Sequence, residues 1–148
     1  MNTIVYALLA AAAGSCIAMQ ASANSNLRRR IDSAEFAAFF SICGTIITAL
    51  VCMVIFRPNT PTWEDLKQTS WWNWIGGPLG VIFVFAGATL TEKLGAAAFI
   101  ALVVGGQLAC SLVFDHFALM GLPEKAITPQ RLLGAALVVA GVVCIKYL

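Results

Sequence analysis

The chain has 148 residues, of which 60% are hydrophobic and 11% are charged. Soluble domains carry roughly 25% charged residues, so this composition excludes an ordinary soluble domain and is typical of an integral membrane protein. The net charge of +2 is small and the basic residues are scattered, which excludes the basic surface of a nucleic-acid-binding protein. We predict an all-α membrane protein with a single transmembrane domain over residues 1–148, whose five helices span about 3–23, 36–56, 71–90, 95–116 and 131–147.

The first apolar stretch, residues 3–23, has some features of a secretory signal peptide. Its end, Ala21-Ser22-Ala23, resembles a cleavage site. However, no Lys or Arg precedes the stretch, and the basic run at residues 28–30 follows it, which opposes export of what comes next. We therefore predict a transmembrane helix, followed by a short basic connection.

Two polar residues lie near the end of this first span. Gln20 and Asn24 are four residues apart and therefore share one face of a helix. They could line a polar cavity, or they could be interfacial residues that hydrogen-bond to the adjoining loop. Both interpretations are open from the sequence.

The second span begins after Ser33, which is a plausible helix cap. Ser41, Thr45 and Thr48 recur along one side of this helix, beside Gly44. Hydroxyls at this spacing usually bond back to their own helix or to a neighbouring one. We favour this packing role over a polar pathway.

Tryptophans gather around the start of the third span. Pro58 and Pro61 end the second helix, and the following TWEDLKQT segment is expected to form a short interfacial turn. Four tryptophans flanking an apolar run are typical of the aromatic belt at a membrane interface. An aromatic substrate cage is the alternative, with Trp72 and Trp74 as its candidate residues.

The third span opens with the sequence WWNWIGGPLG. Gly76 and Gly80 are four residues apart, which favours close contact with another helix. Gly77 and Pro78 favour a kinked or opened helix end, and unwound backbone beside a cavity recurs in transporters. We assign Gly76 and Gly77 to a candidate substrate pathway and Gly80 to packing. The TEKL segment, residues 91–94, is predicted to be a tight turn.

The fourth span carries polar groups at its centre and at its end. Gly105, Gly106 and Gln107 lie together near its middle, and Asp115 and His116 close it. A buried amide in lipid needs a partner, and glycines let another backbone approach. We assign Gln107 to the substrate pathway and the two glycines to helix packing. Asp115 and His116 could form an interfacial ion pair or helix cap, or a proton relay.

The last span, residues 131–147, carries Gly134 and Gly141 two turns apart, which predicts a packing or dimer face.

The five cysteines all lie in apolar runs, so we interpret them as packing residues and predict no metal site and no cofactor. An enzyme is disfavoured, because the chain has a single His and its acidic residues lie in loops or at helix ends.

The basic residues are almost balanced between the two sides of the membrane. Five spans place the two termini on opposite sides of the membrane. The side that holds the connection after the first span then carries Arg28, Arg29, Arg30, Lys93 and Lys146. The opposite side carries Arg57, Lys67, Lys125 and Arg131. This small excess leans toward an outside N-terminus and a cytoplasmic first connection, and it permits insertion in both orientations. Two oppositely oriented copies would form an inverted repeat with a site at the membrane midplane. A paired homologous subunit could serve the same purpose.

These motifs together resemble a known family. Gln20 and Asn24, the WWNWIGGPLG entry, the GGQL run at residues 105–108 and the DHF run at residues 115–117 are similar to the YdcZ-type small five-helix inner-membrane proteins of the drug/metabolite transporter superfamily. The last span, from Gly134 to Val142, is also similar to the dimer-forming final helix of small multidrug resistance proteins.

The resemblance implies a bacterial inner-membrane exporter of a small organic molecule, working as half of a ten-helix inverted-repeat transporter by alternating access. Members of the family occur singly, in pairs or as ten-helix fusions. The chain departs from the multidrug resistance proteins because its first helix lacks their membrane-embedded glutamate and contains no Asp or Glu at all. A non-transporting membrane scaffold or accessory subunit is the alternative function; a continuous polar cavity would distinguish the two.

Overall fold

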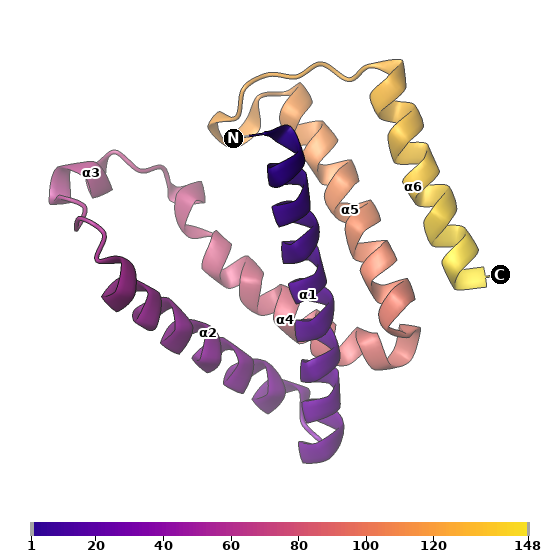
Figure 1. Cartoon of the computed structure of the whole chain (residues 1–148), viewed down its shortest axis with the longest axis horizontal. Coiled ribbons are helices and arrows are strands. Elements are labelled where there is room, and N and C mark those ends of the chain that lie inside the picture. The colour runs from indigo at the N-terminus through magenta and orange to yellow at the C-terminus, as the bar shows by residue number, and fades with distance from the viewer. Residues whose placement is uncertain (1, 148) are drawn as a thin grey trace. The chain divides into compact units, whose positions relative to one another are not determined.

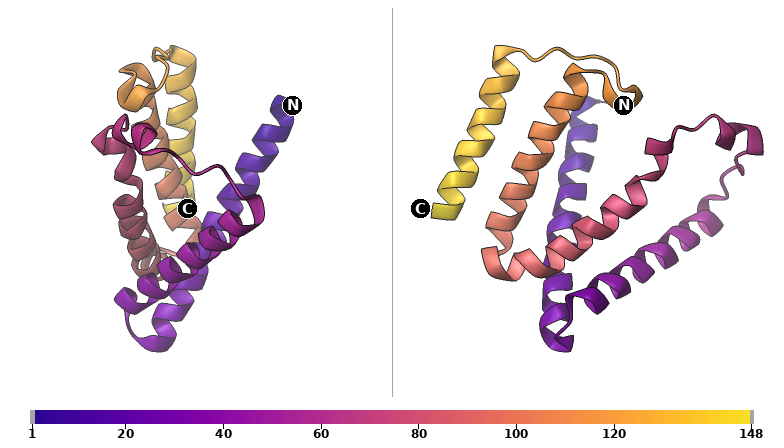
Figure 2. Two further views of the ribbon diagram at one scale, coloured as in Figure 1. Left: turned by 90° about the vertical axis from the view of Figure 1, so that its left-hand side faces the viewer. Right: turned by 180° about the vertical axis from the view of Figure 1, so that it is seen from behind.

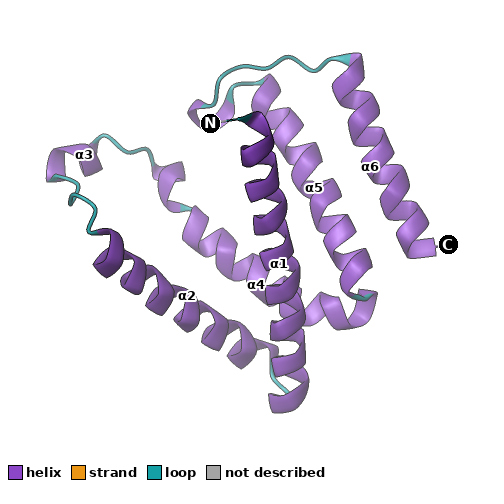
Figure 3. Cartoon of the chain, viewed as in Figure 1, coloured by secondary structure: helices purple, strands orange, loops and turns teal. Residues whose placement is uncertain are grey.

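The structure is a computed structural model that describes residues 2–147. Helices make up most of this part of the chain, and it contains no strand (Figure 3). The helices are α1 (Thr3–Ile31), α2 (Ala34–Phe56), α3 (Trp63–Lys67), α4 (Gly76–Leu94), α5 (Ala96–His116) and α6 (Pro129–Tyr147), with short 3-10 helices η1 (Trp71–Trp74) and η2 (Leu119–Gly121). The predicted all-α class is confirmed.

Five segments within the described residues are long and apolar enough to cross a membrane, as predicted. They are α1, α2, the η1–α4 segment Trp71–Leu94, α5 and α6. At 1.5 Å per residue, each of them can cross a hydrocarbon core of about 30 Å. The chain forms two compact units, residues 1–93 and 94–148, which are described separately below.

Helix α1 extends beyond the predicted end of the first span at residue 23. It continues to Ile31 and so includes the basic run that was predicted to lie in a connection. Arginine is a good helix former, and basic side chains in the last turn interact favourably with the helix dipole. The next residue, Asp32, adopts the left-handed conformation and caps the C-terminus of the helix.

The predicted turn at residues 91–94 is helical in the structure. Helix α4 continues through these residues to Leu94, and only Gly95 separates it from α5, which begins at Ala96. Gly95 has a φ of +82°, a conformation that side chains with a Cβ rarely adopt. A single glycine therefore replaces the four-residue turn.

In the first unit, α2 turns back beside the C-terminal part of α1 and then diverges from it (Figures 1 and 2). The Ser33 side chain caps α2 by accepting a hydrogen bond from the Phe36 N–H, as the sequence predicted. The buried residues of this unit are small: Ala21, Asn24, Ser25, Ala37, Ala38, Gly87, Ala88 and Thr91. Small residues allow helix backbones to approach closely in a membrane.

In the second unit, α5 and α6 run antiparallel and side by side (Figures 1 and 2). A Cβ added at Gly105 would lie 3.7 Å from Cγ2 of Val142, so this glycine belongs to the α5–α6 contact. The connection between the helices contains η2 and the left-handed residues Ala118 and Met120.

Candidate substrate cavity

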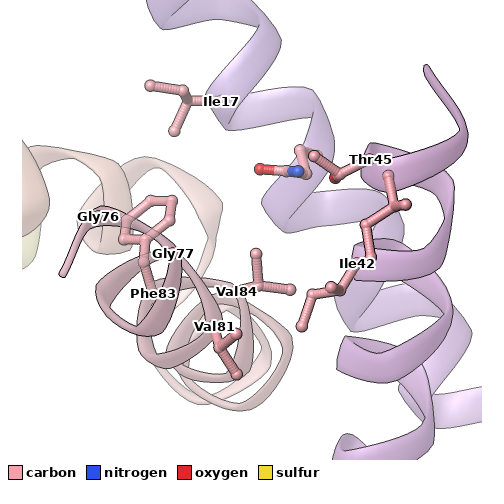
Figure 4. A pocket seen from close by; sticks show the side chains of 11 residues that line it. Ile17, Ile42, Thr45, Gly76, Gly77, Val81, Phe83 and Val84 are labelled. Carbon is pink, nitrogen blue, oxygen red and sulfur yellow. The ribbon is translucent and has the colours of Figure 1, made fainter. Parts of the chain in front are cut away.

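The first unit contains a cavity of about 600 Å³ between α1, α2 and α4. Figure 4 shows Ile17 of α1, Ile42 and Thr45 of α2, and Phe83 and Val84 of α4 around one open space. The complete lining is Ile17, Gln20, Ile42, Thr45, Ile46, Gly76, Gly77, Gly80, Val81, Phe83 and Val84. The volume lies within the usual range for small-molecule sites, about 300–1,000 Å³.

Gln20 supplies the free polar group of this cavity. Within residues 2–147, its carboxamide makes no hydrogen bond, whereas the Thr45 hydroxyl donates to the Ser41 carbonyl of its own helix at 3.1 Å. The Thr48 hydroxyl likewise donates to the Gly44 carbonyl at 2.8 Å. Both hydroxyls thus bond back to their own helix, as predicted, and Gln20 remains available to a ligand.

Glycines form part of the α4 wall. Gly76, Gly77 and Gly80 line the cavity, and a Cβ added at any of them would meet no atom within 4 Å. They lie at the start of α4, directly after the 3-10 turn of η1 and around Pro78. Pro78 lies in the first turn, where its missing N–H leaves no hydrogen bond unmade. This wall is therefore backbone, with open space beside it.

Two polar contacts lie beyond the cavity on the side of the α1 C-terminus. Asn24, one turn after Gln20, is buried, and its Nδ2 donates to Ser41 Oγ on α2 at 3.1 Å. Arg28, one turn further, forms an ion pair with Glu92 of α4 at 2.5 Å. Asn24 does not line the cavity; it holds α1 against α2.

The tryptophans lie outside the cavity lining. Trp72 and Trp74 are exposed, and neither borders the cavity. The Trp74 Nε1–H donates to Thr69 Oγ1 at 2.9 Å, and Trp71 packs edge-on against Trp72 with 5.8 Å between ring centroids. These exposed rings lie next to the start of α4, and the interfacial belt stays a prediction for them.

Gln107 lies in the second unit, on an exposed part of α5. Its side chain makes no hydrogen bond within the described residues. An unpartnered amide in the apolar part of a membrane span costs free energy until it finds a polar partner. Gly106 beside it is exposed as well, with no atom within 4 Å of an added Cβ.

Asp115 and His116 do not contact one another as an acid–base pair in this structure. Asp115 Oδ2 forms an ion pair with the Arg131 guanidinium, which also donates to the Lys125 carbonyl at 2.8 Å. His116 Nδ1 faces the Ile127 N–H at a long 3.5 Å, and its ring packs edge-on against Phe117. The ion pair thus joins the C-terminal end of α5 to the N-terminal part of α6.

The glycines of α6 have open space beside them within their own unit. An added Cβ at Gly134 or Gly141 would meet no atom within 4 Å. Gly141 also borders an apolar groove of about 320 Å³ between α5 and α6. Among the described residues, no group of three or more His, Cys, Asp or Glu side chains could hold a metal ion.

Comparison with known proteins accounts for this architecture. The family model described as "Putative inner membrane exporter, YdcZ" matches residues 5–144. The chain belongs to this family. The inner membrane protein YdcZ of Escherichia coli (strain K12) is 38% identical to it over 102 residues, which cover 68% of this chain and 66% of that protein. The matched segment thus spans just under two thirds of the curated relative's length. No solved structure matches the chain.

This YdcZ-family chain is therefore a multi-pass protein of the inner membrane, and its family is described as one of membrane exporters, which is a class of transporters rather than of enzymes. The match covers all five spans. It agrees with the resemblance found in the Gln20, WWNWIGGPLG and GGQL segments.

Sequence reasoning did not find the apolar walls of the cavity or the ion pair that holds α1 to α4. Ile17, Ile42 and Val84 are ordinary apolar residues in apolar spans, and nothing in the pattern distinguishes them. Glu92 did give a signal, because a carboxylate at the end of a membrane helix needs a cationic partner. The predicted turn at residues 91–94 concealed it.

Proposed function

We propose that the protein is a secondary transporter that exports a small organic molecule across the inner membrane. The observation that carries this proposal is the cavity between α1, α2 and α4, in which the Gln20 carboxamide has no partner among the described residues. A non-transporting accessory subunit does not need such a cavity. The family supports the direction of transport, because its members are described as exporters.

Alternating access is supported by the distribution of polar contacts around the cavity. The Asn24–Ser41 hydrogen bond and the Arg28–Glu92 ion pair hold the helices together on one side. On the other side, towards α3 and η1, α2 and α4 diverge (Figures 1 and 2). The opposite access state would break these contacts and open the cavity toward the α1 C-terminus.

A dimer is supported by polar and small residues that lie exposed on α5 and α6 of the second unit. Gln107 and Gly106 are exposed on α5, and Gly134 is exposed on α6. These residues would contact an antiparallel second copy or a homologous subunit, and the pair would form the ten-helix inverted repeat. Gln107 would then hydrogen-bond to the partner or to the substrate.

Alternating access is tested by labelling a cysteine at position 20 from one side of the membrane. The five native cysteines are replaced by alanine, Gln20→Cys is added, and the protein is reconstituted in sealed vesicles with a membrane-impermeant maleimide on one side only. We expect nearly complete labelling from either side in separate samples. Met19→Cys is the control, because Met19 lies on another face of α1 at the same depth, is 72% exposed and does not line the cavity.

A static cavity gives a different labelling result. If the chain inserts in both orientations without alternating, each side labels only part of the protein, and if it has one orientation, only one side labels. Either result would contradict alternating access.

The dimer model is tested by a compartment-sensitive reporter, placed at the C-terminus in one variant and after Ile31 in another. Signal from both compartments for one site supports an antiparallel homodimer, and signal from one compartment excludes it.

A further inference from the structure

The cavity in the first unit has no charged residue in its lining. The polar side chains that border it are the Gln20 carboxamide and the Thr45 hydroxyl, and the latter already donates to its own helix. The next polar residues on the same face of α1 are also occupied: Asn24 donates to Ser41, and Arg28 is paired with Glu92. A charged group in this cavity would therefore lose hydration without gaining a counter-charge, a large cost in an apolar environment.

Gln20 distinguishes a free ligand from a lipid acyl chain. Its carboxamide has two donor hydrogens and an acceptor oxygen, and none of them has a partner within the described residues. An acyl chain would fill the apolar space and leave the amide unpaired. A molecule with one hydrogen-bonding group on an apolar body satisfies the amide and the Ile17, Ile42 and Val84 walls together.

The glycine wall sets the size of the ligand. Gly76, Gly77 and Gly80 border the cavity, and side chains added there would enter open space rather than another helix. Replacing a helical glycine by a residue with a higher helix propensity does not weaken the helix. A large side chain at Gly80 should therefore reduce the cavity volume without unfolding the protein.

We propose that this cavity binds an uncharged, predominantly apolar small molecule through a single hydrogen-bonding group that pairs with Gln20. The inference rests on the proposed transport function, for which it defines the substrate class. It excludes the organic cations that the glutamate of small multidrug resistance proteins binds, because no carboxylate borders the cavity.

The test measures binding of three matched fluorescent probes to the full-length protein in lipid nanodiscs. The neutral probe is N-phenyl-1-naphthylamine, which carries one N–H donor. The charged probes share its scaffold: the 8-sulfonate and a trimethylammonium derivative. Empty nanodiscs of the same lipid correct for partition into the bilayer. We expect saturable binding of the neutral probe and none of the two charged probes.

Two variants tie the binding to the cavity. Gln20→Leu keeps the side-chain size and removes the amide, and we expect the Kd of the neutral probe to rise about tenfold, the usual effect of one lost hydrogen bond. Gly80→Leu should abolish saturable binding. Gly14→Leu is the matched control, because Gly14 is an exposed glycine of α1 with no atom within 4 Å of an added Cβ and does not border the cavity.

The outcomes separate the ligand class from the transport function. Saturable binding of a charged probe, an unchanged Kd in Gln20→Leu, or no saturable binding of any probe would overturn the ligand class; an unchanged Kd would indicate an acyl-chain site. If the neutral probe binds as expected but the position-20 cysteine labels from one side only, the ligand class stands and the proposed transport mechanism fails. Equal size-exclusion profiles of all variants confirm folding.

Discussion

The Asn24 side chain of α1 donates a hydrogen bond to Ser41 Oγ of α2 at 3.1 Å, one helical turn beyond the cavity. Asn24 is buried, so its amide depends on this partner in an environment without water. Ser41 also lies one turn before Thr45, which borders the cavity. The bond therefore fixes the approach of α1 to α2 where the cavity ends.

We expect this pair to be energetically coupled. Asn24→Ala, Ser41→Ala and the double variant, measured as unfolding free energies in detergent micelles, should give a coupling energy of about 0.6 kcal/mol, the average for interhelical hydrogen bonds in membranes. Ser22→Ala is the control, because the Ser22 hydroxyl donates to Ala18 of its own helix. Additive effects of the two substitutions would show that the bond does not form in the membrane.

The Arg28–Glu92 ion pair should respond to charge reversal. The side chains are 29% and 40% exposed, so we expect Arg28→Glu to reduce stability by less than about 1 kcal/mol. Arg28→Glu combined with Glu92→Arg should restore both stability and the wild-type labelling rate at a position-20 cysteine. Arg29→Glu, one residue away and without an ion pair among the described residues, is the control. Identical results for Arg28→Glu and Arg29→Glu would exclude a role for the pair.

Asp115 should contribute to structure, and His116 should not relay protons. Asp115→Asn weakens the contact with Arg131 that fastens the α5–α6 connection, so we expect faster proteolysis within residues 117–128. His116→Gln should leave the pH dependence of position-20 labelling unchanged. A change in this pH dependence in His116→Gln would instead support the proton-relay interpretation.

Thr91 offers a stabilising substitution. Its Oγ1 is buried and has no hydrogen-bond partner within the described residues. Thr91→Val replaces the hydroxyl by a methyl group of similar size, and removing a buried unsatisfied polar atom should raise stability by about 1 kcal/mol. A higher unfolding temperature in detergent checks this. The matched control is Thr89→Val, which removes a hydroxyl that donates to the Phe85 backbone carbonyl at 2.8 Å.

The short helix α3 should open at low pH. The Thr62 hydroxyl and backbone N–H donate to Asp65 and lower the pKa of its carboxyl from its ordinary value. Because the folded-state pKa is depressed, this contribution is fully present above the unfolded-state value and is lost as the pH falls through the folded-state pKa. The protection factor of the Thr62 amide, which corrects for the intrinsic pH dependence of hydrogen exchange, should fall over that range, and in Asp65→Asn it should not change there.

The sequence by itself determined the all-α class, the five spans and the family. These follow from local patterns: long apolar stretches, prolines after the second helix, and motifs such as WWNWIGGPLG and GGQL. The ends of the helices were harder to predict from the sequence. The basic run after α1 and the TEKL segment are polar, which favours a connection, but their residues are good helix formers and continue α1 and α4.

Only the tertiary structure decided which polar residues share a site. Gln20 and Asn24 lie on one face of α1, and the sequence does not distinguish their roles. In the structure, Asn24 hydrogen-bonds to Ser41, whereas Gln20 borders the cavity and has no hydrogen-bond partner among the described residues. Arg131, sixteen residues away in sequence, pairs with Asp115. Such partners depend on how helices pack, and packing is a relationship between distant segments that the period of one helix does not encode.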